Sequence, residues 1–221
     1  YNEWDADEVI YLDITREGDH DFRRSDHAYR GVTDRYELVR QIASQAFMPL
    51  TFGGGVRTLD DFAKLIANGA DKVTLNTAAY ETPDLISAAA NKFGAQAVVV
   101  SIDVKDDHVQ THCGTRRTHL RPVQWARDVE RLGAGEILLN SVERDGTLQG
   151  YDTSLVRSVS QAVGIPVVAC GGAGSYEHLK EGLDAGAHAV AAGALWTFTD
   201  CTPKGAANYL ATQGYHTRIA A

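Results

Sequence analysis

The residues of this sequence that could carry out chemistry stand at the ends of apolar stretches. In "AVVVSID" a run of valines leads to a single carboxylate, Asp103. A carboxyl group in this position is suited to general acid or base chemistry once its surroundings adjust its pKa; the alternative is a structural aspartate that caps the next turn. The other apolar stretches end at Asp13, Gly55, Asn76 with Thr77, Asn140 with Ser141, Gly172, and Gly193.

Two glycine turns are candidates for binding phosphate. Gly55 in "FGGGVRT" and Gly172 in "CGGAGS" each stand between an apolar strand pattern and a helical pattern. Glycine lets the backbone turn tightly there and brings N–H groups toward a ligand at the start of the next helix, where the dipole favours an anion. The pair therefore predicts two phosphate sites, although glycine is also common wherever a strand simply turns into a helix.

Other charged residues have two interpretations each. Asp145 in "RDGT" could orient a phosphate-binding turn, but Asp-Gly is also an ordinary turn pair. Asp13 either contacts a ligand or holds loops together by hydrogen bonds. Glu8, Lys72 and Glu136 each begin an apolar stretch, at the end opposite to the glycines. These three form either a ring of ion pairs or a solvated rim.

The elements that position these residues alternate between strand and helix. Apolar runs predict seven strands, and runs without polar alternation suit strands buried on both faces of a parallel sheet. Helical patterns such as "LDDFAKLIANG" and "VQWARDVERLG" lie between them. The predicted strands are residues 8–14, 49–54, 72–77, 97–103, 136–141, 166–172 and 189–194. Strand and helix in alternation predict a parallel sheet with right-handed crossovers.

An internal repeat extends this prediction to a (β/α)₈ barrel built of two half-barrels. The segment from Pro49 recurs from Pro166, 117 residues later, whereas "EVIYLDITREG" recurs as "EILLNSVERDG" 128 residues later. We assign the difference to an insertion, Gly18 to Asp34, in a loop over the barrel mouth. Under this symmetry the mate of strand 97–103 falls before residue 1, so we expect a single domain, 1–221, that lacks its first strand. A different fold of seven strands is the alternative.

Composition excludes several classes of function. The formal net charge of −8 argues against a general affinity for nucleic acid or anionic membranes. No apolar run approaches the roughly 20 residues of a membrane-spanning helix, and a cytoplasmic protein is expected. The three cysteines and the histidines lack metal-ligand spacing, so no metal, disulfide framework or cofactor is predicted.

Several of these stretches together resemble the cyclase subunit of imidazole glycerol phosphate synthase. They are "GGGVRT", "GADKVTLNTAA", "SIDVK", "GAGEILLNSVERDGT" and "ACGGAGSYEHLKEGLDAGAHAVAAGA". The resemblance implies a (β/α)₈ barrel that takes ammonia from a glutamine amidotransferase docked on the barrel floor. At the top, ammonia would react with a bisphosphorylated aminoimidazole carboxamide ribonucleotide, giving imidazole glycerol phosphate and an aminoimidazole carboxamide ribotide. Such an enzyme is a lyase of histidine biosynthesis that works as a heterodimer.

The same resemblance assigns roles to individual residues. Asp103 would be one of two catalytic carboxylates, the other lying on the absent first strand. One phosphate would be held by Gly55, Asn76 and Thr77. The other would be held by Asp145, Gly146, Gly172, Ala192 and Gly193. Glu8, Lys72 and Glu136 would form the charged gate that ammonia passes.

The sequence departs from the histidine-pathway pattern near the substrate. Asn140 replaces a threonine that is common there, and Gly193 with Ala194 replaces a turn that usually has serine. The stretches "FMPLTFGGG" and "ACGGAG", together with "NS", resemble paralogues found with surface-polysaccharide genes, which are thought to supply ammonia for forming an amidine on a sugar. Two further hypotheses are a non-catalytic phosphate-binding barrel and a single-chain sugar-phosphate isomerase.

Overall fold

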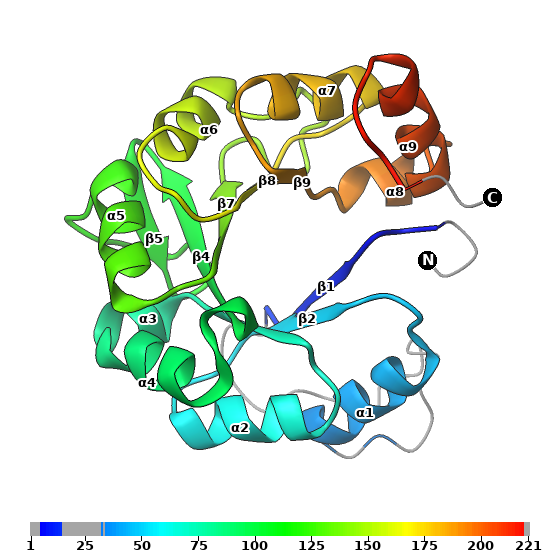
Figure 1. Cartoon of the computed structure of the whole chain (residues 1–221). Coiled ribbons are helices and arrows are strands. Elements are labelled where there is room, and N and C mark those ends of the chain that lie inside the picture. Colours follow the sequence, from blue (N-terminus) through cyan, green and yellow to red (C-terminus); the bar gives the residue numbers. More distant parts are fainter. Residues whose placement is uncertain (1–4, 15–31, 33, 219–221) are drawn as a thin grey trace.

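The strands of the protein form one curled parallel sheet (Figure 1). The computed structural model describes residues 5–14, 32 and 34–218. The parallel strands, in their order around the sheet, are β1 (Val9–Leu12), β2 (Leu50–Gly53), β3 (Lys72–Leu75), β4 (Val98–Lys105), β7 (Glu136–Ser141), β8 (Val167–Cys170) and β9 (Ala189–Val190). All seven strands predicted from the apolar runs are therefore confirmed.

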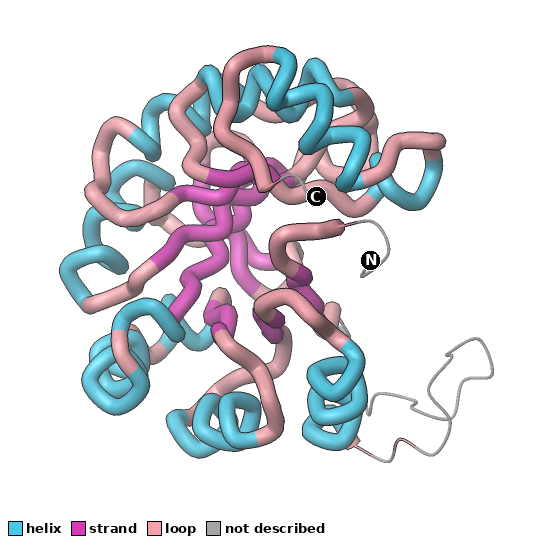
Figure 2. Tube along the Cα trace, turned by 45° about the vertical axis from the view of Figure 1, so that its right-hand side comes forward, coloured by secondary structure: helices cyan, strands magenta, loops and turns pink. Residues whose placement is uncertain are grey.

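Helices lie around the outside of the sheet, as the tube in Figure 2 also shows. They are α1 (Arg35–Gln45), α2 (Leu59–Ala67), α3 (Thr77–Glu81), α4 (Asp84–Phe93), α5 (Pro122–Leu132), α6 (Thr153–Ser160), α7 (Tyr176–Asp184), α8 (Ala194–Phe198) and α9 (Pro203–Thr212), with a 3₁₀ turn at Ala95–Ala97. Side-chain caps begin several of them: Thr58 and Asp61 form a capping box on α2, and Ser175 caps α7. Gly69 and Gly186, which the repeat aligns, both follow their helices with positive φ.

The sheet is that of a (β/α)₈ barrel. Each parallel strand pairs with the next, from β1 to β9, and the described strands leave the barrel open between these two. The two copies of the repeat, β2–α2–β3 and β8–α7–β9, form corresponding parts of the two halves. Most of the predicted insertion, Gly18 to Asp34, lies outside the described residues.

A β-hairpin after β4 was not predicted. β5 (His108–Thr111) pairs antiparallel with β4, and β6 (Arg116–Arg117) pairs antiparallel with β5. The turn between β4 and β5 consists of Asp106 and Asp107, both with positive φ, as in the tight turns that suit hairpins.

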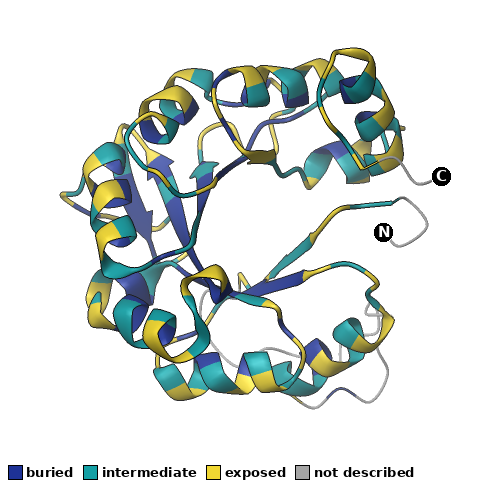
Figure 3. Ribbon diagram, in the orientation of Figure 1, coloured by how far each residue is buried: buried dark blue, intermediate teal, exposed yellow. Residues whose placement is uncertain are grey.

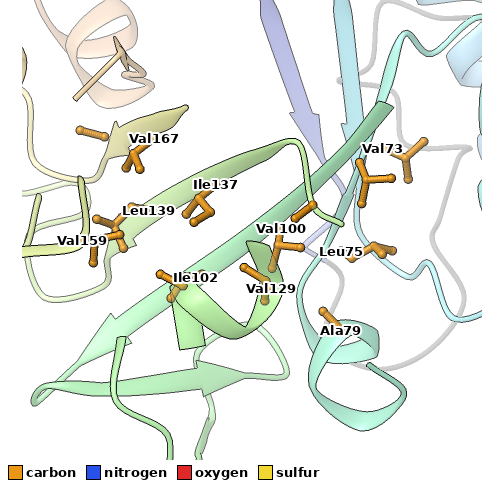
Figure 4. Close-up of a cluster of buried hydrophobic side chains, with 14 of the residues drawn as sticks. Val73, Leu75, Ala79, Val100, Ile102, Val129, Ile137, Leu139, Val159 and Val167 are labelled. Atoms are coloured by element: carbon orange, nitrogen blue, oxygen red, sulfur yellow. The ribbon is translucent and has the colours of Figure 1, made fainter. Parts of the chain in front are cut away.

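Apolar side chains fill two separate layers on the two faces of the sheet. Between sheet and helices lies the main core, drawn in Figure 4, to which β4 contributes Val100 and Ile102. Inside the barrel lies a smaller cluster around Val99, Leu138 and Val168. Burial on both faces explains the continuous apolar runs of the central strands, which are buried in Figure 3.

Among the described residues, no helix is both long and apolar enough to cross a membrane.

Candidate active site

Strand β4 carries Asp103 to the C-terminal edge of the sheet, where two polar side chains hold it. Ser101, two residues earlier on the same face, donates from Oγ to Asp103 Oδ1 at 3.0 Å. Asn140 is the partner of Asp103 on β7, and its side-chain amide donates to the same carboxylate. Burial raises the pKa of Asp103, these two donors oppose the rise, and the charge of Asp145 adds to it. The net effect is a raised pKa, which suits a group that exchanges protons.

Next to Asn140, strand β8 adds a neutral thiol, and the amide oxygen of Asn140 itself is a buried acceptor. Cys170 is the partner of Asn140 on β8. Burial, together with the charges of Asp145 and Asp103, raises the pKa of its thiol to about 12, so the sulfur is protonated at neutral pH. Asn140 Oδ1 is buried and has no hydrogen-bond partner in the described part of the chain. This oxygen can therefore accept a hydrogen bond from a ligand beside Asp103.

The first glycine turn follows β2 and lies against the end of β1. Gly54 and Gly55 have φ of +95° and +61°, and a Cβ on Gly54 would lie 2.1 Å from the carbonyl oxygen of Asp13. Asp13 also donates its backbone N–H to Gly53 at 2.9 Å. Among the described residues, no acceptor is found for the N–H groups of Gly55 and Val56. The turn thus offers two adjacent donors to a ligand, as predicted for a phosphate site.

Asn76 and Thr77, at the end of β3, are engaged by the hairpin. Asn76 Nδ2 donates to the carbonyl oxygens of Ser101 at 3.1 Å and Gln110 at 3.4 Å. Thr77 Oγ1 accepts the backbone N–H of His112 at 2.9 Å. The hairpin therefore fixes both residues at the C-terminal edge of the sheet. Their role toward phosphate remains a prediction.

The second glycine turn follows β8. Gly171 and Gly172 have φ of +86° and +112°, and Gly150 donates its backbone N–H to the carbonyl of Gly172 at 2.8 Å. Asp145 and Gly146 lie in the turn after β7, and Asp145 donates its backbone N–H to Ser141 at 2.9 Å.

The last strand brings Ala192 and Gly193 to the same edge of the sheet. Gly193 directly precedes α8, and the space where its Cβ would stand is open. Tyr151, next to Gly150, donates its hydroxyl to the carbonyl of Ala191 at 2.9 Å, which links the second turn to the end of β9.

Comparison with known proteins gives one consistent result. Residues 25–200 match the family described as "Histidine biosynthesis protein". The chain belongs to this family. It is also 46% identical, over 197 residues, to the imidazole glycerol phosphate synthase subunit HisF of Sulfurisphaera tokodaii, an alignment that covers 87% of this chain and 75% of that protein. The predicted resemblance to the cyclase subunit is confirmed.

At the floor of this histidine-biosynthesis barrel, the three predicted charges form one cluster. Lys72 Nζ lies 3.0 and 2.9 Å from the two carboxylate oxygens of Glu8, and 2.9 Å from Glu136 Oε2. Burial lowers the pKa of Lys72, but its bonds to the two carboxylates outweigh this and leave the pKa raised. The ring of ion pairs is confirmed over the solvated rim, while a role in admitting ammonia stays a prediction.

The side chain of Ser141 lies on the other face of β7 from that of Asn140. Because side chains alternate along β7, Asn140 faces the barrel interior and Ser141 faces the helices. Ser141 lines a cavity of about 330 Å³ that Pro122, Asp152 and Leu155, from the beginnings of α5 and α6, also line.

Sequence reasoning missed Ser101 and Cys170. Ser101 could have been found, because it stands two residues before Asp103 and therefore on the same face of the strand. Cys170 could have been found in the same way, as the last residue of an apolar strand.

Proposed function

We propose that this protein is the cyclase subunit of an imidazole glycerol phosphate synthase in histidine biosynthesis. It would use ammonia to convert a bisphosphorylated aminoimidazole carboxamide ribonucleotide into imidazole glycerol phosphate and an aminoimidazole carboxamide ribotide. The single observation that carries the proposal is the position of Asp103, a half-buried carboxyl group with a raised pKa at the same sheet edge as two glycine turns. The 46% identity to HisF supports it.

The two turns give the proposed substrate its orientation. Gly55 and Gly172 are equivalent residues of the repeat, each at the end of a strand and close to the N-terminus of a helix. Backbone N–H groups at such positions favour phosphate. A substrate with a phosphate at each end would be fixed at both, so that its middle part lies over Asp103.

Asp103 would carry the proton transfers of the reaction. Adding ammonia to a carbonyl, losing water and releasing an amine all require protons to move to and from nitrogen and oxygen. A carboxyl group whose pKa is raised can serve as acid in one step and base in the next. Ser101 and Asn140 hold its carboxylate in place, and Asn140 Oδ1, which has no partner among the described residues, would accept a hydrogen bond from the substrate.

The barrel interior suggests a route for ammonia from the floor to Asp103. Lys72 and its two carboxylates lie at one end, and the apolar cluster around Leu138 lies further in. Thr51 and Thr74, on the inward face of β2 and β3, are buried, and their hydroxyls have no hydrogen-bond partner within the described residues. Small neutral ammonia can pass such a path and bond to these hydroxyls in transit. We place a glutamine amidotransferase, its source, at the floor around Lys72.

A second candidate keeps ammonia but uses another acceptor. Asn140, one of the residues that depart from the histidine-pathway pattern, contacts the catalytic candidate directly. In a surface-polysaccharide paralogue the same barrel would form an amidine on a sugar.

The test is direct turnover. The purified full-length protein is incubated with ammonium at high pH and the bisphosphorylated ribonucleotide, and the products are followed by mass spectrometry. We expect imidazole glycerol phosphate and the ribotide in equal amounts. No product from folded protein would refute the proposal, and would leave the sugar acceptor and the non-catalytic barrel to be tested. Glutamine should replace ammonium only when the amidotransferase is added.

A further inference from the structure

The first glycine turn is fastened by a side chain from another helix. Arg35, the first residue of α1, donates from Nη1 to the carbonyl oxygens of Gly55 at 2.9 Å and Gly54 at 3.4 Å. Its other terminal nitrogen, Nη2, donates to Asp61 Oδ1 at 3.0 Å and to the hydroxyl of Tyr36 at 3.1 Å. The guanidinium group therefore joins α1, the turn and the beginning of α2.

These contacts decide where the N–H groups of the turn point. In a trans peptide the C=O and the N–H of the next residue point in opposite directions. Holding the carbonyls of Gly54 and Gly55 toward Arg35 therefore directs the N–H groups of Gly55 and Val56 away from it. These are the two N–H groups for which no acceptor is found among the described residues. The next two N–H groups, of Arg57 and Thr58, are already bonded to Asp61 Oδ2.

The second turn obtains the same arrangement by different means. The carbonyl of Gly172, which the repeat aligns with Gly55, accepts a backbone N–H from Gly150 at 2.8 Å. His178 aligns with Asp61, and its Nδ1 accepts the N–H of Gly174 at 3.1 Å, as Asp61 accepts that of Arg57. The two turns are thus built alike but held differently. In the second turn a backbone N–H holds the glycine carbonyl, whereas in the first turn the side chain of Arg35 holds it.

We propose that Arg35 is the positioning residue of the first phosphate site: by binding the Gly54 and Gly55 carbonyls it aims the N–H groups of Gly55 and Val56 at the phosphate. The inference rests on the proposed function, because it takes these N–H groups as phosphate ligands. Asp61 and Tyr36 hold the guanidinium in place from the other side. The first site is then sensitive to one side chain of α1, and the second site is independent of it.

The test is a titration with inorganic phosphate, followed residue by residue through the amide resonances of ¹⁵N-labelled protein. In the wild type we expect the N–H signals of Gly55 and Val56, and those of Gly172 and Ala173, to shift with phosphate. In Arg35→Ala the first pair should respond about tenfold more weakly, the effect expected when hydrogen bonds that fix a charged ligand's donors are lost, and the second pair should be unchanged.

Two control variants distinguish the positioning role of Arg35 from an effect of its charge and from an effect on the stability of the fold. Arg35→Lys keeps the positive charge beside Asp61 but loses the planar group that bonds two carbonyls, so it should resemble Arg35→Ala. Arg40→Ala removes an arginine of the same helix, whose one bonding partner within the described ranges is Asn68 Oδ1, at 3.2 and 2.7 Å, and this variant should respond as the wild type does. A purely structural Arg35 would lower the unfolding midpoint without selecting one pair of signals.

The outcomes distinguish the inference from its premise. If all four signals shift equally in the wild type and in Arg35→Ala, the positioning role of Arg35 is refuted and the phosphate sites stand. If none of the four responds in the wild type, the phosphate sites of the proposed function fail, and the role of Arg35 fails with them.

Discussion

Replacing Gly172 by alanine tests the geometry of the second turn. Gly172 has a φ of +112°, outside the region that other residues adopt easily, and a Cβ there would lie 2.2 Å from the carbonyl oxygen of Gly150 and 2.9 Å from Arg144 Cβ. Since Gly150 also donates the hydrogen bond that holds the Gly172 carbonyl, the substitution would push apart the two segments that form the turn.

The expected loss of stability has three parts. Backbone strain at such a φ is on the order of 1–3 kcal/mol, the lost hydrogen bond about 1 kcal/mol, and the displacement of packed backbone about 1–3 kcal/mol. We therefore expect Gly172→Ala to lower the free energy of unfolding by roughly 3–7 kcal/mol. Two other glycines of the proposed site provide matched controls.

The controls separate the stability cost of backbone strain from the cost of the steric clash. Gly146 has a φ of +75° but open space around its Cβ, so Gly146→Ala should cost only the strain, about 1–2 kcal/mol. Gly193 has a φ of −114° and open space, so Gly193→Ala should stay within about 0.5 kcal/mol of the wild type.

Unfolding in urea, followed by circular dichroism, measures all three variants. A Gly172→Ala variant as stable as Gly193→Ala would refute this description of the turn.

Three further predictions concern the other parts of the site. Asn140→Leu removes a donor that favours the ionised form of Asp103, so the pKa of Asp103 should rise further. The acidic limb of the pH–rate profile should then move to higher pH, and an unmoved limb would count against the hydrogen bond from Asn140 to Asp103. Lys72→Met leaves Glu8 and Glu136 without their cation and should destabilise the half-buried cluster by roughly 1–3 kcal/mol at neutral pH. Because the pKa of Lys72 is raised in the folded protein, this difference should persist up to pH 10.5 and shrink as pH rises through the folded pKa; a difference independent of alkaline pH would argue against the ion pairs. Cys113 is exposed, whereas Cys170 is half-buried and the pKa of its thiol is about 12, so at pH 8 a thiol reagent should label Cys113 in the folded protein much faster than Cys170; equally rapid labelling of Cys170 in the folded state would contradict its raised pKa.

The barrel could be predicted from the sequence because the burial of its strands and the helices between them leave a visible pattern in the chain. Strands buried on both faces need continuous apolar runs, and parallel strands need helices between them, so each strand was visible in the chain. The repeat added the equivalence of Gly55 and Gly172, which the positive φ of both residues confirms.

The contacts that adjust the site were not predictable, because they join segments far apart in the sequence. Arg35 reaches a turn 19 and 20 residues later, and nothing in its own surroundings marks it. The hairpin that engages Thr77 comes from a polar segment 35 residues further on, held by two aspartates with positive φ in place of the usual glycine. Ser141 is a different case: the end of its strand was predicted correctly, and the alternation of side chains places Ser141 on the face opposite to Asn140, beside a cavity between the sheet and the helices.

The central claim is that Asp103 carries the chemistry between two phosphate-binding turns, and one variant tests it most directly. Asp103→Asn keeps the size of the side chain and removes its ability to exchange a proton. With ammonium and the bisphosphorylated ribonucleotide as substrates, we expect single-turnover product formation to fall at least about a thousandfold, while the affinity for the ribonucleotide stays within about threefold of the wild type. Product formation at close to the wild-type rate in Asp103→Asn would contradict the account.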